Sequence, residues 1–386
     1  MKVEHIRARL LEDLKRLRSP DGYLYAGSPR YHTLFGRDSL ISGWQTLEID
    51  SSIARETLVA LASRQGTQVN ATREEEPGKI LHEHRFDPAS RQELPYWEFP
   101  YFGSVDSTPL FLVLGGRYLR HTQDETLLVS LWPQFRAAYE WVKRSEEVGG
   151  GFLRYQRMNP HGLFHQGWKD GSDDHLKIRP PVAIVEAQGY AFAAYQEFSG
   201  MAERRGEAAL AQEAEARATS LRQRFNRTFW LRGGGLALGL DGAGVPRDVS
   251  TSNPGHLLFS GILPTDRVDA TVARLFAPDL WTRFGIRTHS NRAPDFDPYG
   301  YHTGTVWPHD NWIIAEGLRE RGREAEANRI GEALVTAYET LSKMPELYAV
   351  VDDQIVDLSK TPQGSTRANP TQAWASAGLL ELLKHR

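Results

Sequence analysis

Apolar residues recur along most of the chain at spacings of three and four residues, which is the period of an amphipathic α-helix. This pattern predicts about twelve helices, over residues 3–17, 37–49, 52–65, 106–121, 124–144, 182–199, 202–230, 255–261, 265–275, 303–321, 323–342 and 370–385. The cluster Asp50-Ser51-Ser52 is typical of a helix start, and Gly200 stands where a left-handed residue could end the sixth helix.

Strand-like alternation is confined to two short segments beside glycine clusters, residues 151–155 and 235–238. An α/β fold therefore has little support. The long loops at 66–105, 145–181, 231–254, 276–302 and 343–369 are rich in Trp, Tyr, His and Asp, which favours ordered, functional loops. Helix hairpins that close into a ring would gather such loops at one end, around a central cavity. We expect an all-α fold, an (α/α)6 barrel, and because no linker or composition shift interrupts the chain, a single catalytic domain over residues 1–386.

The amino-acid composition excludes several classes of active site and of binding partner. The 386 residues include no cysteine, which excludes a thiolate nucleophile, an iron–sulfur cluster and a disulfide framework. A net charge of −3 gives no electrostatic footprint for nucleic acid. No stretch approaches the ~20 apolar residues of a membrane span, and the charged N-terminus lacks a signal-peptide core, so a cytoplasmic location is the default. Ten Trp, 14 Tyr and 16 Phe suggest a site that stacks flat, uncharged ligands. The oligomeric state stays open.

Two carboxylates beside aromatic residues are the strongest catalytic candidates. Asp170 follows Trp168 in a long loop, and Glu346 follows Pro345 in another. An inverting glycosidase needs such a pair on opposite sides of a cavity, one as a protonated acid and the other as a base for water. A neighbouring Trp would raise the pKa of the acid by desolvation, and the proline would fix the backbone of the base. An Asp-rich loop is more often a solvated turn, so spacing alone does not decide.

Three further segments have two interpretations each. Arg37-Asp38 opens a helix, either as a surface pair near the helix N-terminus or as a charged fork that binds sugar hydroxyls. His82-Glu83-His84 departs from the His-Glu-x-x-His spacing, which favours a hydrogen-bonded polar loop over a metal site. The segment 300–311, which holds Trp307 and His309, is either a helix cap with packed aromatic residues or part of a binding site.

Taken together, these segments resemble the amylo-α-1,6-glucosidase family, the C-terminal part of glycogen debranching enzymes, and more distantly the glucoamylases. The resemblance runs in one order over about residues 31–380, through FGRDSLIS, PGKILHEHR, PYFGSVDSTPLFL, QGWKD, VEAQGYAF, GIRTHS, YHTGTVWPHDNWIIAEGL, MPEL and NPTQAWASAGLL. It implies an (α/α)6 toroid. The set of nine segments is specific, although each one alone is weak.

The resemblance also implies residue roles. Asp170 in Trp-x-Asp matches the general acid, and Glu346 in Pro-Glu-Leu matches the general base. Arg37 and Asp38 match the pair that holds the terminal sugar. Trp168, Arg287, Trp307 and His309 fall in segments that line the pocket in relatives. Relatives usually continue after Trp-Lys-Asp with Ser-Trp-Asp, whereas this chain has Gly171-Ser172-Asp173-Asp174 and so lacks an aromatic platform on the aglycone side.

The sequence thus predicts an inverting exo-acting α-glycosidase that releases a terminal sugar, with glucose as the first expectation, from short oligosaccharides or small glucosides. Its mechanism needs no metal or organic cofactor. The alternative is a compatible-solute hydrolase, acting on mannosyl- or glucosylglycerate, or another sugar-active enzyme on the same barrel, because fold alone does not choose among them. A non-catalytic carbohydrate-binding protein would have no reason to keep both carboxylates.

Overall fold

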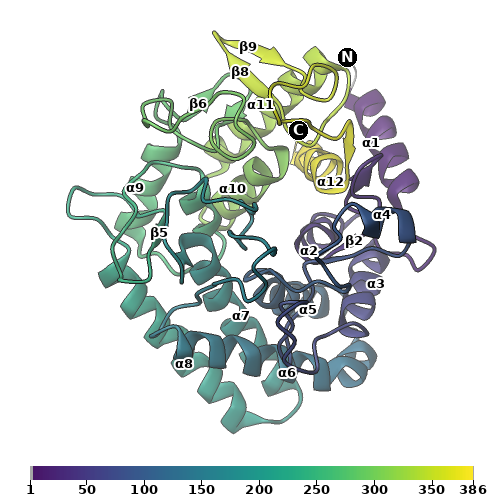
Figure 1. The fold of residues 1–386 in the computed structure, drawn as a ribbon, viewed down its shortest axis with the longest axis vertical. Coiled ribbons are helices and arrows are strands. Elements are labelled where there is room, and N and C mark those ends of the chain that lie inside the picture. Colours follow the sequence, from purple (N-terminus) through teal and green to yellow (C-terminus); the bar gives the residue numbers. More distant parts are fainter. Residues whose placement is uncertain (1–2, 386) are drawn as a thin grey trace.

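The computed structural model describes residues 3–385 and is an (α/α)6 barrel, as the helical periodicity predicts. Figure 1 shows the helices arranged around a central axis, and α1 packs against α12, so the two ends of the described chain meet. The inner ring runs in the order α2 (Gly36–Gln45), α5 (Ser107–Thr122), α7 (Val185–Arg204), the 3₁₀ helix η1 (Asn253–Leu257), α10 (Pro308–Glu320) and α12 (Ala373–Leu382). Contacts between α12 and α2 close it.

The outer helices each pack against the inner ring. They are α1 (Val3–Leu17), α3 (Ser51–Ala62), α6 (Glu125–Val148), α8 (Ala208–Thr228), α9 (Thr265–Leu275) and α11 (Glu324–Leu341). A short helix α4 (Pro88–Gln92), capped by Asp87, lies in a loop where the periodicity predicts no helix, and η2 (Leu383–His385) follows α12. None of the helices within residues 3–385 combines the length and the apolar character that crossing a bilayer requires.

The strands are two- or three-residue antiparallel ladders rather than a sheet. They pair β1 (Gly27–Ser28) with β10 (Thr371–Gln372), β2 (Leu34–Phe35) with β3 (Glu83–His84), β4 (Ala183–Ile184) with β5 (Gly239–Leu240), β6 (Trp281–Thr282) with β7 (Gly285–Ile286), and β8 (Ala349–Val351) with β9 (Gln354–Val356). Three of these strands, β2, β4 and β10, end where α2, α7 and α12 begin. The ladders therefore fix where inner helices start.

Several local predictions are confirmed and others are wrong. The Asp50 carboxylate accepts a hydrogen bond from the Ser52 backbone N–H at 3.1 Å and caps α3, as its sequence cluster indicates. Gly200 does not end its helix, because buried Met201 and Ala202 carry α7 on to Arg204, and the left-handed glycine is Gly206.

The two strand predictions are also wrong. Residues 151–155 and 235–238 contribute only isolated bridges, Tyr155 with Val182 and Leu236 with Trp230. A strand needs a partner segment that pairs with it over several consecutive residues, and each of these two segments pairs at a single residue.

We predict opposite stability effects at two helical glycines. Gly200 is exposed inside α7, and no atom lies within 4 Å of the place that an alanine Cβ would take, so Gly200→Ala should raise the free energy of unfolding by up to about 1 kcal/mol. A methyl group at Gly36 would overlap the Leu81 carbonyl oxygen and the Ser107 hydroxyl, so Gly36→Ala should lower it by about 1–3 kcal/mol. Urea unfolding measures both, and a Gly200→Ala protein less stable than wild type would contradict the helix assignment.

Candidate active site

A cavity of about 550 Å³ opens at the end of the barrel where α2, α10 and α12 begin. Six of the eight predicted site residues line it: Arg37, Asp38, Trp168, Asp170, Trp307 and Glu346. Arg287 and His309 do not. The Arg287 guanidinium donates to the Val350 carbonyl oxygen at 3.0 Å, and the His309 ring stacks on Trp374 with centroids 3.6 Å apart, behind the cavity wall. Both stay predictions as substrate contacts.

Asp170 lies beside the closing pair of a loop, where His165 and Gly171 exchange backbone hydrogen bonds in both directions, at 3.1 and 3.2 Å. A quarter of its side-chain surface is exposed, and one oxygen accepts a hydrogen bond from Arg37 Nη2 at 2.5 Å. Burial raises the pKa of the Asp170 carboxyl above its ordinary value, while the Arg37 cation acts in the opposite direction. Asp170 can therefore hold a proton at a higher pH than an exposed aspartate.

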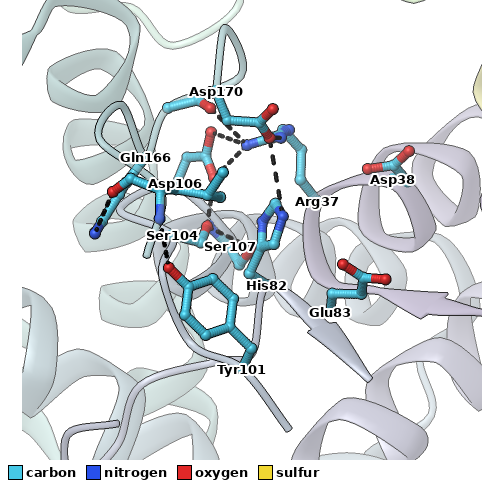
Figure 2. Close-up of polar contacts among 12 residues, drawn as sticks. Arg37, Asp38, His82, Glu83, Tyr101, Ser104, Asp106, Ser107, Gln166 and Asp170 are labelled. Carbon is cyan, nitrogen blue, oxygen red and sulfur yellow. Dashed lines mark hydrogen bonds and ion pairs between the residues drawn. The ribbon is translucent and has the colours of Figure 1, made fainter. Parts of the chain in front are cut away.

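Arg37 does not pair with its sequence neighbour Asp38. Its Nη1 donates to both oxygens of Asp106, at 3.1 and 2.9 Å, and to the Gly167 carbonyl oxygen at 2.9 Å (Figure 2). Both Arg37 and Asp38 are buried, with 3% and 6% of their surface exposed, so the surface-pair interpretation is wrong. Arg37 is instead an internal cation shared between Asp106 and Asp170.

Asp38 lies at the cavity wall in the first turn of α2, apart from this cluster in Figure 2. Its carboxyl accepts a hydrogen bond from Gln372 Nε2 at 3.3 Å. Burial raises its pKa to about 7, against the effect of Arg37 and with support from the charges of Asp170 and Glu346. The Asp38 carboxylate oxygens are thus not occupied by Arg37, and they can accept hydrogen bonds from a ligand in the cavity.

Glu346 is held by neutral donors. Tyr301 donates its hydroxyl hydrogen to Oε1 at 2.5 Å, and the Asn369 backbone N–H donates to Oε2 at 2.8 Å. The Glu346 N–H returns a bond to the Asn369 carbonyl oxygen at 3.0 Å, which locks the backbone. Burial raises the pKa of this carboxyl, and the two donors act against that rise. The arrangement orients a carboxylate toward the cavity.

Aromatic rings form much of the remaining wall. Trp168 and Trp307 meet edge to face with centroids 5.7 Å apart, and the Trp307 indole N–H donates to the Tyr301 carbonyl oxygen at 2.8 Å. His302 stacks on Trp307 at 5.3 Å. Together these contacts fix a rigid surface of the kind that sugar rings pack against.

The His82-Glu83-His84 segment contributes polar contacts at the same cavity. His82 Nε2 lies 4.0 Å from Asp170 Oδ2, and burial holds the pKa of this imidazole well below its ordinary value. Glu83 accepts from Arg85 Nε at 2.5 Å, and burial raises its pKa to about 7. His84 pairs with Leu34 through the β2–β3 ladder.

Sequence reasoning missed several residues that hold the site together. Asp106, Tyr301, Asn369 and Gln372 all fall inside the segments that carried the family resemblance, yet no spacing rule singles them out. Arg30 lies in the loop before β2 and carried no signal at all. The common reason is that each acts through a contact between parts of the chain that are distant in sequence.

The family model for the mannosylglycerate hydrolase MGH1-like glycoside hydrolase domain matches residues 105–353, which include Asp170 and Glu346. The chain belongs to this family. It is a glycoside hydrolase. A curated mannosylglycerate hydrolase of Rubrobacter radiotolerans is 29% identical over 147 residues, which is 37% of this chain. The match spans 33% of that relative's length.

Solved structures confirm the fold at low sequence identity. A GH63 mannosylglycerate hydrolase from Thermus thermophilus, bound to Tris and D-glycerate, is 16% identical with a TM-score of 0.72, covering 99% of this chain and 100% of that one. A glucose complex from the same organism gives 16% identity and a TM-score of 0.73 over 99% and 100% of the two chains. The family model confirms the resemblance stated from sequence at the level of glycoside hydrolases, and the solved structures confirm its barrel fold. The debranching family itself is not shown.

We expect Asp170→Asn and Glu346→Gln each to lower kcat by at least about 10²–10⁴-fold, because each removes a proton-transfer group while preserving size. Asp173→Asn is the matched control, since the Asp173 side chain is 86% exposed in the same loop, and it should stay within about twofold of wild type. Initial rates on a glycoside that the wild-type protein hydrolyses measure these changes in kcat. An inactive Asp173→Asn beside an active Asp170→Asn would reverse the assignment of the acid.

Proposed function

We propose that this chain is an inverting hydrolase that removes one α-linked hexose from a small anionic aglycone, with mannosylglycerate as the first substrate to test. The observation that carries the proposal is that Asp170 and Glu346 face one cavity with different hydrogen-bonding partners. Unlike environments are what separate an acid from a base when both are carboxylic acids. The family model and the curated relative of this chain are both named for mannosylglycerate hydrolases, which favours glycerate glycosides over glucose oligomers as substrates.

In the proposed mechanism Asp170 donates its proton to the glycosidic oxygen as the bond to the anomeric carbon breaks. Glu346 takes a proton from a water that attacks the opposite face of the sugar, so the product has the inverted configuration. Tyr301 and Asn369 keep the Glu346 carboxylate aimed at that water. Asp38 would accept hydrogen bonds from hydroxyls of the terminal sugar. The reaction as written requires only these side chains and water.

The size of the cavity fits a small substrate. Its volume of about 550 Å³ is within the range of ~300–1,000 Å³ that is usual for small-molecule pockets. Ser172 lines the cavity after Asp170, where relatives carry an aromatic platform in the resembling motif. A polar side chain there suits a hydroxylated or charged aglycone better than a second sugar ring.

Arg30 supplies the charge that an anionic aglycone requires. It is exposed at the cavity, and its guanidinium donates to the Arg367 carbonyl oxygen at 3.0 Å and to the Tyr31 hydroxyl at 2.6 Å. The other two arginines that line the cavity, Arg37 and Arg85, both form ion pairs with carboxylates. Within the described part of the chain, Arg30 has no carboxylate at ion-pair distance, although its charge acts to lower the pKa of the Glu346 carboxyl. Its guanidinium can therefore still form an ion pair with a substrate carboxylate.

We expect mannosylglycerate or glucosylglycerate to be hydrolysed with at least about tenfold higher kcat/KM than maltose, isomaltose or trehalose, because an ion pair with the aglycone is lost in the neutral sugars. Proton NMR during the first minutes measures the rate and should show the β-anomer of the released sugar first. Asp170→Asn is the negative control for contaminating glycosidase. Efficiency that climbs with each added glucose unit would support a glucan-directed glucosidase instead.

A second test concerns Arg30 alone. Arg30→Ala should raise KM for a glycerate glycoside by about 10-fold or more, because this substrate has a carboxylate. On the pH plateau, kcat/KM for the corresponding glycosylglycerol should change by less than about threefold, since the effect of Arg30 on the pKa of Glu346 is confined to the acidic limb. Arg30→Lys should recover part of the loss, since it restores the charge without the planar fork. An equal loss of kcat/KM on both substrates would mean that Arg30 supports the structure of its loop and does not bind the aglycone carboxylate.

A further inference from the structure

One buried guanidinium at the site serves two carboxylates, and the second of them has no assigned role. Figure 2 shows Arg37 between Asp106 and Asp170. Asp106 is fully buried just before α5, accepts from Arg37 through both oxygens, and also accepts from the Ser104 hydroxyl at 2.7 Å. Arg37 is thereby fixed at its Nη1 end, and its Nη2 end reaches the proposed acid.

This contact creates a conflict that the mechanism must resolve. A general acid has to keep its proton until the substrate arrives, yet a cation at hydrogen-bond distance favours the ionised carboxylate. Arg37 donates to Asp170 at 2.5 Å in a site that is shielded from water on the arginine side, with 4% of the Arg37 side chain exposed. A lone arginine in this position would oppose the chemistry.

The other groups that face Asp170 do not settle the conflict. His82 stays neutral, because burial lowers its pKa well below the ordinary value. Asp38, Glu83 and Glu346 share the cavity and are acidic, and burial raises the pKa of each. The nearby hydroxyls of Tyr31, Tyr101 and Tyr301 are held protonated, since burial raises their pKa. Besides Asp170 itself, Asp106 contacts Arg37 directly, and its charge raises the pKa of Asp170.

We propose that Asp106 is a positioning residue that anchors Arg37 and neutralises part of its charge, so that Asp170 can hold the proton it donates. This inference rests on the proposed role of Asp170 as the general acid. Arg37 then orients Asp170 through one nitrogen without stripping its proton. The three residues come from separate segments, α2, the turn before α5 and the loop at 165–171, so the contact also sets the distance between those segments.

The decisive variant is Asp106→Asn, which keeps the shape and a carbonyl acceptor for Arg37 but removes the charge. The alkaline limb of the pH profile of kcat/KM reports the acid, so it should move to lower pH by about one unit or more. The rate on mannosylglycerate should fall about tenfold at pH values above the alkaline limb and change little on the plateau below it. Asp173→Asn, at an exposed carboxylate of the neighbouring loop, should leave the limb in place.

A second substrate separates this role from a purely structural one. The hydrolysis of α-mannosyl fluoride needs no proton from the acid to expel fluoride, so Asp106→Asn should hydrolyse it within about threefold of wild type at every pH. Loss of activity on the fluoride and on the glycoside in equal measure would overturn the proposal, as would an unmoved alkaline limb. A wild-type protein that hydrolyses neither substrate would overturn the proposed function itself, which is a different result.

Ser104→Ala keeps the proposal testable if Asp106→Asn does not fold. Without the Ser104 hydroxyl, the Asp106 carboxylate relies more on Arg37, and Arg37 then acts less on Asp170. The alkaline limb should move to higher pH by a few tenths of a unit, opposite to the direction for Asp106→Asn. A shift to lower pH in Ser104→Ala would contradict the proposal.

Discussion

The inner helices of the barrel begin at the same end, and this shared polarity decides which charges the cavity can contain. The positive end of each helix dipole points toward the site. Carboxylates accordingly stand in or just before the first turn of four inner helices, namely Asp38 in α2, Asp106 before α5, Glu186 in α7 and Asp310 in α10. Backbone N–H groups without helical partners help to accommodate buried acidic groups that would otherwise be expelled or protonated.

Burial nevertheless raises the pKa of two of these carboxyl groups toward neutral pH. It raises the pKa of both Asp38 and Glu186 to about 7. The proposed catalytic pair is placed differently, on loops beyond the helix ends, where backbone pairing fixes each residue: His165 with Gly171 around Asp170, and Glu346 with Asn369. The inner helices set the electrostatic environment of the cavity, and the loops orient the Asp170 and Glu346 side chains. Asp170 and Glu346 then differ because one contacts a cation and the other contacts neutral donors.

The sequence predicted the helices well because their buried faces repeat with the helical period, as in α6, where Leu128, Phe135 and Trp132 all point inward. It failed at Gly200 because tertiary burial of Met201 overrides a local stop signal. Three of the two-residue ladders could not be predicted because each depends on a partner far along the chain. The fourth, β6 with β7, is a local hairpin whose strands are too short to show an alternation of apolar and polar residues. Asp170 and Glu346 became candidates through their sequence neighbours, and the family resemblance supplied the roles proposed for them. Asp106 and Arg30 stand out only when distant parts of the chain meet in the folded structure.

The substrate question shows why the barrel alone is insufficient. An acid, a base and a hydroxyl-binding aspartate serve glucosidases and glycerate-glycoside hydrolases alike, so the roles proposed for Asp170, Glu346 and Asp38 do not distinguish the two. Discrimination must come from the rim, where the aglycone lies. There this chain has Ser172 in place of an aromatic platform and the exposed Arg30 without a carboxylate partner among the described residues. A glucan would leave that cation without a partner and would find a serine at position 172 in place of the aromatic platform, whereas a short acidic aglycone would pair with the cation and need no platform there.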